Sequence, residues 1–397
     1  MTRDRSVLYA QQLDSVVSIR QNNIQYPYHA WLEVDTNAII HNYREIRLRL
    51  SPQTKILAVL KADAYGMGGI SVSKVLEKEG VDCIGVALVP EARVLREAGI
   101  GRRIFLMSPP FEWEIREVVN LNLEVIVPDI RVAHALSNEA IRQAKKVKVH
   151  IKVDTGMHRL GILPEELPQL LSEIEKMQGI EVIGLYTHFS RADEEDQSNT
   201  IASLKAFEIN VDYETEDFAK KRHVANSAVI LNPPFPKLHK EMDLVRPGIL
   251  LYGYSPSMEL DKMAGRFKPA VSLKSRIIQV KRISSEVTIG YGGTYKTPYS
   301  GFIAVASIGY GDGYPRQMSN KGEVLIGGRH FQISGRVCMD HVMVFCGEYQ
   351  PEYGDEVVLL GSQGNEEVTM FDWVSWLDTI PHEILCCFSP RLPRVYV

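Results

Sequence analysis

The sequence predicts an α/β protein in which an N-terminal (β/α)8 TIM barrel is followed by a mostly-β C-terminal domain. Short apolar, β-branched runs alternate with longer helix-like segments, which is typical of a parallel sheet. About eight such repeats follow one another, the number that closes a barrel. After residue 262 the pattern changes to strand-like runs with glycine-rich turns, and 397 residues are too many for one ordinary domain.

Residues 1–28 are polar and contain several Gln and Asn, and we interpret them as an extension of the folded part. The barrel is assigned to residues 29–262. Its predicted strands are the runs 56–60, 83–88, 104–107, 123–127, 147–153, 182–188, 223–225 and 244–251, with helix-like segments such as 89–98 and 130–144 between them. A doubly wound open sheet, which also alternates strands and helices, is the alternative.

Residues 263–397 are assigned to the mostly-β domain. The runs 271–283, 302–310, 323–337 and 342–347 are strand-like, and their turns contain glycine. Helical signals nearly vanish in this part until residues 370–377.

Composition limits the class of protein. Apolar residues make up 45% and charged residues 24% of the chain, as in globular proteins, and the formal net charge of -4 argues against a dedicated nucleic-acid binder. No apolar run reaches the roughly 18 residues of a membrane span, and the N-terminus lacks the apolar core of a signal peptide. The five cysteines show no paired metal-ligand spacing, so we expect reduced thiols, a cytoplasmic location and no metal site.

Polar side chains that can carry chemistry stand at the ends of the predicted strands. Active sites of TIM barrels lie at the C-terminal ends of their strands. The residues at or just after those ends are Lys61, Lys152, Asp154, Arg159, His188, Asn226, Ser227, Arg246 and Gly248. The pattern therefore predicts a functional site on that rim of the barrel.

Two features of this rim suggest a chemistry. Lys61 ends a buried run, and loss of hydration lowers the pKa of a lysine toward the neutral amine that Schiff-base chemistry needs. A structural lysine that extends from a strand end to water is the alternative. Ser227 and Gly248 follow the last two strands, where TIM barrels often bind phosphate, although ordinary turn chemistry explains them equally.

The sequence also resembles the alanine racemase family. The matching blocks are AVLKADAYGMG, VKVDTGMHRLG, YTHFSRADE, HVANSA, LVRPGILLYG, IGYGGTY, IGYGDGYPR and GRVCMDHVMV, in the order that the family has. The resemblance implies an enzyme that interconverts L-alanine and D-alanine with pyridoxal 5'-phosphate and supplies D-alanine for peptidoglycan. It also implies a homodimer in which the two subunits share the active sites, acting on a small amino acid and binding neither nucleic acid nor membrane.

The resemblance implies a role for each matching residue. Lys61 matches the lysine that holds the cofactor as a Schiff base and is one of two proton-transfer bases; Tyr291 matches the second base, supplied by the other subunit. Further cofactor contacts are implied for Tyr65, His188, Asn226, Ser227, Arg246, Gly248, Ile249 and His382. Substrate contacts are implied for Arg159 and Met339. Supporting roles are implied for Lys152, Asp193, His223, Tyr310, Arg316, Arg336 and Asp340.

Some of these roles are more specific. Arg246 matches the arginine on the pyridine nitrogen, and His188 matches the histidine that supports Arg246 and Tyr291. Because arginine keeps its proton, that nitrogen would stay unprotonated, and side reactions such as transamination would be disfavoured. The residues that match the substrate channel are Asp193, His223, Tyr310, Arg316 and Arg336.

Three positions raise separate expectations. His158 stands where the family usually has glycine, and His382 stands where it usually has a tyrosine on the cofactor phosphate. Lys152 lies on the same strand face as His150 and Asp154, close to Arg159, and the resemblance implies a carbamylated lysine there. A lysine paired with Asp154 is the alternative.

Three other functions compete with alanine racemisation. One is a different enzyme on the same two-domain plan, such as an amino-acid decarboxylase or a racemase of broader specificity. A decarboxylase would not need Tyr291 opposite Lys61. The others are a non-enzymatic cofactor-binding barrel, against which the long β domain with its candidate base argues, and a barrel without cofactor, which would leave the strand-end lysine and the phosphate-type site unexplained.

Overall fold

The structure, a computed structural model, describes residues 27–212, 222–234 and 238–397, with the backbone alone for 209–212. These residues form two compact units. The barrel unit is Ile39–Lys268, and the β unit consists of the described residues up to Ala38 together with Pro269–Val397. The expected extension, residues 1–28, lies almost wholly outside the described residues and stays a prediction.

The barrel unit contains a sheet of eight parallel strands within the described ranges. They are β2 (Lys55–Val59), β3 (Cys83–Val86), β4 (Arg103–Leu106), β5 (Glu124–Val127), β6 (Val147–Lys152), β7 (Ile180–Tyr186), β8 (Arg222–His223) and β9 (Leu244–Val245). Their order is β8-β7-β6-β5-β4-β3-β2-β9. A bridge between Asn226 and Arg246 joins the two edges, so the predicted barrel is confirmed in a nearly closed form.

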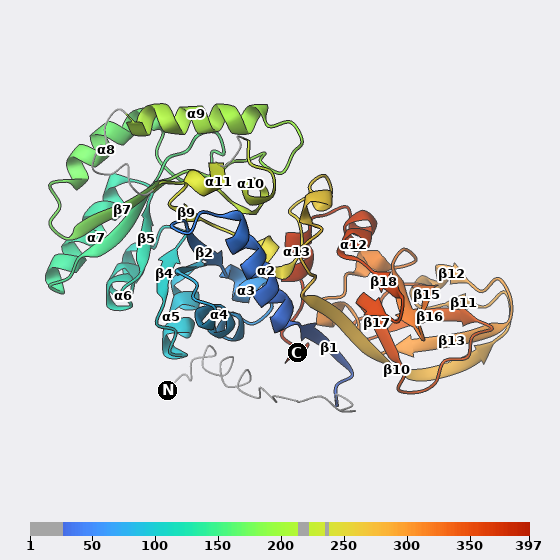
Figure 1. The fold of residues 1–397 in the computed structure, drawn as a ribbon. Helices are drawn as coiled ribbons and strands as arrows, with labels where there is room; N and C mark the ends of the chain where they lie inside the picture. Colours follow the sequence, from blue (N-terminus) through green and yellow to red (C-terminus); the bar gives the residue numbers. More distant parts are fainter. Residues whose placement is uncertain (1–26, 213–221, 235–237) are drawn as a thin grey trace, which may run out of the picture. The chain divides into compact units, whose positions relative to one another are not determined.

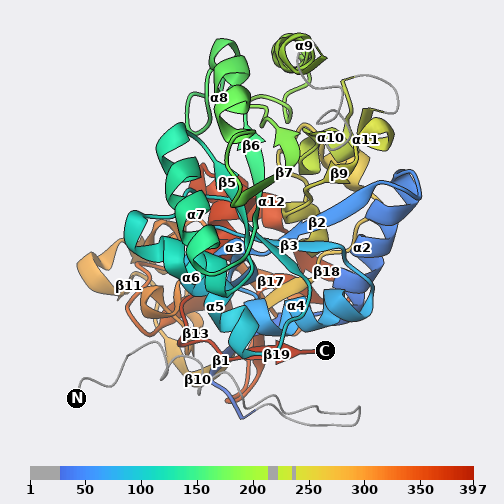
Figure 2. The same ribbon diagram turned by 90° about the vertical axis from the view of Figure 1, so that its left-hand side faces the viewer.

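Helices lie on the outside of this sheet, as Figures 1 and 2 show for α4 to α8. The helices of this part of the chain are α2 (Thr36–Arg49), α3 (Lys61–Tyr65), α4 (Gly69–Lys78), α5 (Val89–Glu97), α6 (Ile115–Asn120), α7 (Ile130–Arg142), α8 (Leu167–Ile174), α9 (Ser198–Asp212), α10 (Ser227–Leu231) and α11 (Leu238–Glu241). Helix α7 illustrates the local rules. The Asp129 carboxylate caps its N-terminus by accepting from two backbone N–H groups, and Ala133, Leu136 and Ala140 form its buried face.

The eighth predicted strand was too long. Of residues 244–251, only Leu244–Val245 is a strand, and Ile249–Tyr252 forms a 3-10 helix. Pro247 has no N–H to donate to a neighbouring strand, and Gly248 then turns the backbone away with φ -123° and ψ -85°. The apolar run continues because the 3-10 turn is buried as completely as a strand would be.

The β unit is built around one large sheet. Its strands are β1 (Ala30–Val34), β10 (Val271–Ile283), β13 (Gly301–Ala306), β14 (Glu323–Ile326), β15 (Arg329–Gln332), β16 (Val342–Gly347), β17 (Glu356–Gln363), β18 (Glu366–Val368) and β19 (Arg394–Tyr396), with the small pair β11 (Thr288–Ile289) and β12 (Tyr295–Lys296) separate from it. Two helices, α12 (Met370–Leu377) and α13 (Pro381–Cys386), complete the unit. The mostly-β prediction for this part is confirmed.

The domain boundary differs from the expected one at the N-terminal side. Residues 29–38 were assigned to the barrel, but strand β1 pairs with β10 antiparallel and with β19 parallel. Its backbone hydrogen bonds are therefore satisfied within the β unit. The alternating pattern of the sequence identifies a strand here and does not tell which sheet it joins.

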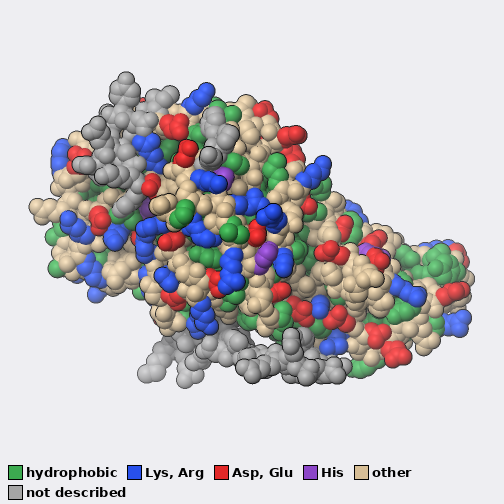
Figure 3. All heavy atoms as spheres, in the orientation of Figure 1, with side chains coloured by type: hydrophobic (Ala, Val, Ile, Leu, Met, Phe, Trp, Pro, Cys, Tyr) green, Lys and Arg blue, Asp and Glu red, His purple; other side chains and the backbone are tan. Residues whose placement is uncertain are grey.

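Three further features of the structure concern its helices, its surface charges and its cysteines. None of the helices within the described ranges has both the length and the apolarity of a membrane span. In the view of Figure 3, Lys and Arg side chains are interspersed with Asp and Glu over the visible face. All five cysteines are described, and none of them forms a disulfide.

Candidate active site

The predicted residues of the barrel unit gather at the C-terminal ends of its strands. Lys61 follows β2, Lys152 is the last residue of β6, His188 lies two residues after β7, and Arg246 directly follows β9. Because the strands are parallel, these ends lie on one rim of the barrel.

Lys61 leads into an unusual backbone turn. Ala62, Asp63, Ala64 and Tyr65 all have φ between 54° and 56°, so α3 is a left-handed turn. For non-glycine residues this conformation costs about 1–2 kcal/mol each. Side-chain acceptors support it: the Asp63 carboxylate accepts from Gly69 N–H at 2.6 Å. Strain of this kind is typical of functional sites.

Glu91 ties this turn to the neighbouring strand. Its Oε1 accepts from Ala62 N–H at 2.6 Å, and its Oε2 accepts from Ala87 and Leu88 N–H at 2.8 and 3.0 Å. One carboxylate thus holds the start of α5 and the residue after Lys61. Sequence reasoning did not single out Glu91, because a glutamate in the first turn of a helix is common.

Tyr65, Ser227 and Gly248 form a second part of the site. Gly248 N–H donates to Ser227 Oγ at 3.0 Å. A Cβ on Gly248 would lie less than 3.0 Å from the Tyr65 hydroxyl, closer than real Cβ atoms approach. Tyr65, Ser227 and Gly248, three of the expected cofactor contacts, therefore lie together, and glycine is needed at 248 for space. Asn226 caps the short helix α10 by accepting from Val229 N–H at 3.1 Å, and Ile249 is buried at the start of the following 3-10 turn.

Arg246 lies in the barrel interior, 2% exposed. Its Nη1 donates to the carbonyl and to Nδ1 of His223, both at 2.8 Å, and its Nη2 donates to Thr187 O at 2.8 Å and Val224 O at 3.2 Å. Its Nε is buried and has no partner among the described residues. Burial lowers the pKa of Arg246 to about 10, so the side chain stays cationic at neutral pH.

His188 faces the same guanidinium. Its Nδ1 lies 3.4 Å from Arg246 Nη2. Because arginine only donates, Nδ1 is the acceptor and Nε2 carries the proton of the neutral ring. Burial and then the positive charge of Arg246 hold the pKa of His188 well below its usual value. His188 therefore presents an N–H donor on the side away from Arg246.

Lys152 is 4% exposed at the end of β6. Burial, and after it the charges of Arg159 and Arg246, lower the pKa of Lys152 to about 8, against the opposing effect of Asp154. The alternative of a Lys152–Asp154 pair is not observed. Asp154 Oδ1 accepts instead from the N–H groups of residues 156, 157 and 158 at 2.9–3.1 Å. Within the described part of the chain, no carboxylate lies in ion-pair distance of Lys152.

His158 occupies a left-handed position, with φ 53°. The resemblance led us to expect glycine at this position, and the φ value is one that glycine adopts without steric cost. Arg159 follows it and is exposed in the single chain.

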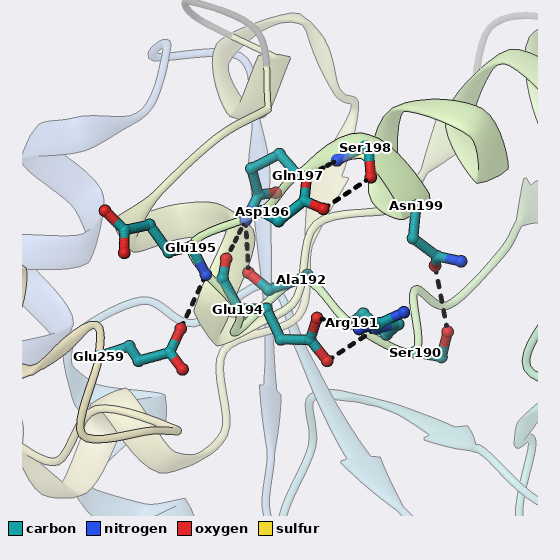
Figure 4. A network of polar contacts seen from close by, with 10 residues as sticks. All are labelled: Ser190, Arg191, Ala192, Glu194, Glu195, Asp196, Gln197, Ser198, Asn199 and Glu259. Carbon is teal, nitrogen blue, oxygen red and sulfur yellow. Dashed lines mark hydrogen bonds and ion pairs between the residues drawn. The ribbon is translucent and has the colours of Figure 1, made fainter.

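Two of the residues with an expected supporting role, His223 and Asp193, lie in different parts of the barrel unit. His223 was expected in the substrate channel, and that expectation was wrong. The side chain is 1% exposed inside the barrel, where Arg246 and His150 both bond to its ring. Asp193 lies in the loop after β7, and its carbonyl accepts from Ser257 Oγ at 2.8 Å. Figure 4 shows the polar contacts that brace this loop, among them Glu195 N–H to Glu259 at 2.8 Å.

The β unit carries a separate group of predicted residues around Tyr291. Tyr291 begins a short 3-10 turn and is 71% exposed in the single chain. Gly290, Gly292 and Gly293 around it have φ of 67°, 72° and 55°. A Cβ on Gly292 would lie 2.9 Å from Nη1 of Arg336, so the Arg336 guanidinium packs over this turn. Two predicted residues of the β unit are thereby brought together.

A second group in the β unit includes Met339 and Tyr310. Met339 O accepts from Gly311 N–H at 2.8 Å, and Tyr310 N–H donates to Cys338 O at 3.0 Å. Arg391, which sequence reasoning missed, bonds to Asp340 at 2.8 Å. Two further predicted residues lie elsewhere in the β unit. Arg316 begins a 3-10 turn, and His382 is the second residue of α13.

Other residues that sequence reasoning missed lie inside the barrel. The Tyr186 ring stacks on His223 with centroids 4.6 Å apart, and Arg246 lies over the same ring at 5.1 Å. Glu124 and Arg103 form an ion pair at the first residues of β5 and β4. A lone glutamate opening the apolar run EVIV was the available signal for Glu124.

Comparison with known proteins agrees with this arrangement. Residues 34–256 match the alanine racemase N-terminal domain, and residues 270–396 match the alanine racemase C-terminal domain. The alanine racemase of Carboxydothermus hydrogenoformans is 40% identical over 370 residues, which is 92% of this chain and 99% of that protein. The alanine racemase of Methanococcus maripaludis is 37% identical over 372 residues, 92% of this chain and 98% of that protein.

Solved structures give the same result. An alanine racemase of Clostridium difficile 630 superposes with a TM-score of 0.87 at 35% identity, covering 94% of this chain and 97% of that one. The alanine racemase of Bartonella henselae, solved with covalently bound pyridoxal phosphate, gives 0.84 at 28% identity, covering 94% of this chain and all of that one. Two family domains in the expected order, together with relatives of this identity and coverage, establish that the chain belongs to the alanine racemase family.

Proposed function

We propose that this protein interconverts L-alanine and D-alanine, with pyridoxal 5'-phosphate held by Lys61. The observation that carries the proposal is the Nε atom of Arg246. It is a buried donor without a partner among the described residues, on the rim where Lys61 follows β2. A buried donor left unpaired is costly, so a ligand with an acceptor there is expected.

The residues present fit this cofactor. The pyridine nitrogen is an acceptor, which suits Arg246 Nε–H. Tyr65, Ser227 and Gly248 provide hydroxyl groups and a close backbone for the phosphate. Lys61, which begins the left-handed turn, provides the amine for a Schiff base.

When it is bound to the amino group of a substrate, pyridoxal phosphate makes the α-proton acidic. Racemisation then needs two groups, one on each face, to remove and return that proton. Lys61 Nζ is the proposed base on one face. Tyr291, from a second copy of the chain in a homodimer, is the proposed base on the other, and its high exposure in the single chain is compatible with that role.

Arg246 and His188 set the conditions for this transfer. Arg246 keeps its proton, so it would hold the acceptor nitrogen of the cofactor without protonating it. His188, neutral and with Nε2–H free to donate away from Arg246, would orient the Tyr291 phenol.

The remaining proposals concern the substrate and its use. Arg159 and the Met339 main chain would bind the carboxylate of a small amino acid. The product D-alanine would serve peptidoglycan synthesis in the cytoplasm, where the five cysteines, none of which forms a disulfide, would stay reduced.

Lys152 is proposed to carry a carbamate. Its lowered pKa leaves a neutral amine available near pH 8, and no carboxylate among the described residues pairs with it. The amine nitrogen attacks the carbon of CO2, an N–C bond forms, and one proton leaves to solvent. The resulting anion would hold Arg159 with charge-assisted hydrogen bonds.

The test is the site of cofactor attachment. The purified holoprotein should show the visible absorption band of a lysine Schiff base. Borohydride reduction followed by peptide mapping should find pyridoxyl-lysine at Lys61. Lys61→Ala should lose the band, whereas Lys55→Ala, which changes the exposed lysine at the start of β2, should keep it. A modified lysine elsewhere would overturn the proposal.

A further inference from the structure

A line of hydrogen bonds crosses the barrel interior below Arg246. His223 Nε2 lies 2.9 Å from His150 Nδ1, and His150 Nε2 lies 3.3 Å from Glu124 Oε2. Glu124 is in turn bound by Arg103, with Nη2 at 2.8 Å from Oε2. Barrel interiors are usually filled by branched apolar side chains, and a buried polar chain is expensive unless every member is satisfied.

Chemistry fixes the direction of each bond. Arg246 has only donors, so His223 Nδ1 must accept from its Nη1. The proton of the neutral His223 ring is then on Nε2, which donates to His150 Nδ1. The proton of His150 is likewise on Nε2, which donates to the Glu124 carboxylate. The donor at one end, Arg246, and the acceptor at the other, Glu124, thereby favour the same tautomer of each histidine.

The charges along the chain agree with this direction. Burial lowers the pKa of both histidines, for His223 together with the charge of Arg246, so both rings are neutral. Burial alone would raise the pKa of Glu124, but hydrogen bonds from His150 and Arg103 outweigh it and hold that pKa at about 2. The chain therefore runs from a cation through two neutral rings to a carboxylate.

The barrel makes room for these rings. A Cβ on Gly184 would lie less than 3.0 Å from His150 Nδ1. The φ of Gly184 lies outside the left-handed region, so glycine is needed there for space and not for its backbone. The Phe105 ring lies 4.4 Å from His150, and Tyr186 stacks on His223. Both histidine rings are therefore held by packing against an aromatic ring as well as by the hydrogen bonds of their nitrogens.

We propose that Glu124 is a positioning residue for Arg246, acting through His150 and His223. It lies at the first residue of β5, the strand end opposite the site. By fixing the His223 tautomer, Glu124 keeps Arg246 Nη1 engaged and leaves Nε as the donor for the cofactor nitrogen. If His223 carried its proton on Nδ1, two donors would face each other and the guanidinium would turn. This inference rests on the proposed function in one respect, the identity of the ligand that accepts from Arg246 Nε; the ordering of the histidine rings does not depend on it.

The first test needs no activity. Nitrogen-15 NMR of histidine-labelled protein, with and without cofactor, should show His150 and His223 as neutral Nε2–H rings throughout pH 6–9. Glu124→Ala removes the acceptor of His150, and its ring should then populate the other tautomer. Glu117→Ala is the matched control, since Glu117 pairs with Arg93 in the same unit and has no contact with the chain of rings.

The second test uses the holoenzyme. Glu124→Ala should lower kcat for alanine about ten- to a hundredfold while KM changes less than about threefold, because the substrate contacts are intact. Glu124→Gln, which keeps an oxygen acceptor without charge, should lose less. If Glu124→Ala does not fold, Gly184→Ala should displace His150 and give the same tautomer change without removing a charge.

Two results would overturn the proposal. One is a protonated Nδ1 on His223 in the wild-type protein. The other is a Glu124→Ala or Gly184→Ala protein with unchanged tautomers and a kcat within twofold of wild type. A wild-type protein that does not racemise alanine would refute the proposed function, whereas the tautomers would still decide whether Glu124 orders the rings.

Discussion

Gly248 and Tyr65 approach each other so closely that no side chain fits at position 248. A Cβ there would lie within 3.0 Å of the tyrosine hydroxyl. The two residues come from opposite ends of the barrel unit's sequence, after β9 and after β2, which are neighbours in the sheet. Their contact defines one side of the proposed phosphate site.

Gly248→Ala should therefore displace the Tyr65 hydroxyl and weaken cofactor binding. We expect the dissociation constant of pyridoxal phosphate to rise at least about tenfold, which is ~1.4 kcal/mol. Equilibrium dialysis of the apoprotein measures it. Gly101→Ala is the control, because its nearest neighbour would be Glu77 Oε1 at 3.6 Å, an ordinary contact. Equal affinities for the two variants would argue against a phosphate site at Gly248.

Tyr291→Phe should lose racemisation by roughly a hundred- to ten-thousandfold and keep bound cofactor, as expected for loss of a general base. Tyr353→Phe, another exposed tyrosine of the β unit, should be neutral. Mixing Lys61→Ala and Tyr291→Phe subunits should restore about one working site per heterodimer. Failure of activity to return after proven subunit exchange would mean that the site is not shared between copies.

Lys152→Ala should lose activity, and acetate should restore part of it by supplying an anion beside Arg159. As a control, Lys148→Ala, which changes an exposed lysine of the same strand, should stay active without an added anion. At a fixed pressure of labelled CO2, the carbamate carbon signal should grow as pH rises through about 8, because the amine must lose its proton first. Full activity of Lys152→Ala without added anion would show that the carbamate is dispensable.

His158 offers a test of backbone strain. With φ at 53°, glycine at this position should make the protein about 1 kcal/mol more stable than alanine does. That order is the reverse of the one expected in ordinary helix or strand. Urea unfolding of His158→Gly and His158→Ala decides it. If the free energy of unfolding of His158→Ala equals or exceeds that of His158→Gly, the left-handed turn is not populated in solution.

The barrel could be read from the sequence because its strands are buried on both faces and appear as short apolar runs. The position of the site on one rim was predictable as well, since the residues that follow parallel strands must meet at one edge of the sheet. The 3-10 turn at Ile249–Tyr252 could not be read, because burial alone makes it resemble a strand. Strand β1 was placed in the wrong unit because pairing partners are decided by tertiary contacts and leave no local signal.

The interior chain was also beyond sequence reasoning. His223 stands in a block that suggested a channel residue, and its burial depends on Tyr186 and His150 from other strands. Glu124 lies 122 positions before Arg246, and only the closure of the barrel aligns them. The glycine at 184 gave no signal either, since its role is to make space for a ring on a neighbouring strand.

The most direct measurement is the fate of pure L-alanine incubated with the purified holoprotein, followed by chiral chromatography. We expect conversion to equal amounts of L- and D-alanine, and the same final mixture when the incubation starts from pure D-alanine. Lys61→Ala should leave either enantiomer unchanged. An alanine sample that stays optically pure, or that loses its carboxyl group as CO2, would contradict the assignment of this site as an alanine racemase.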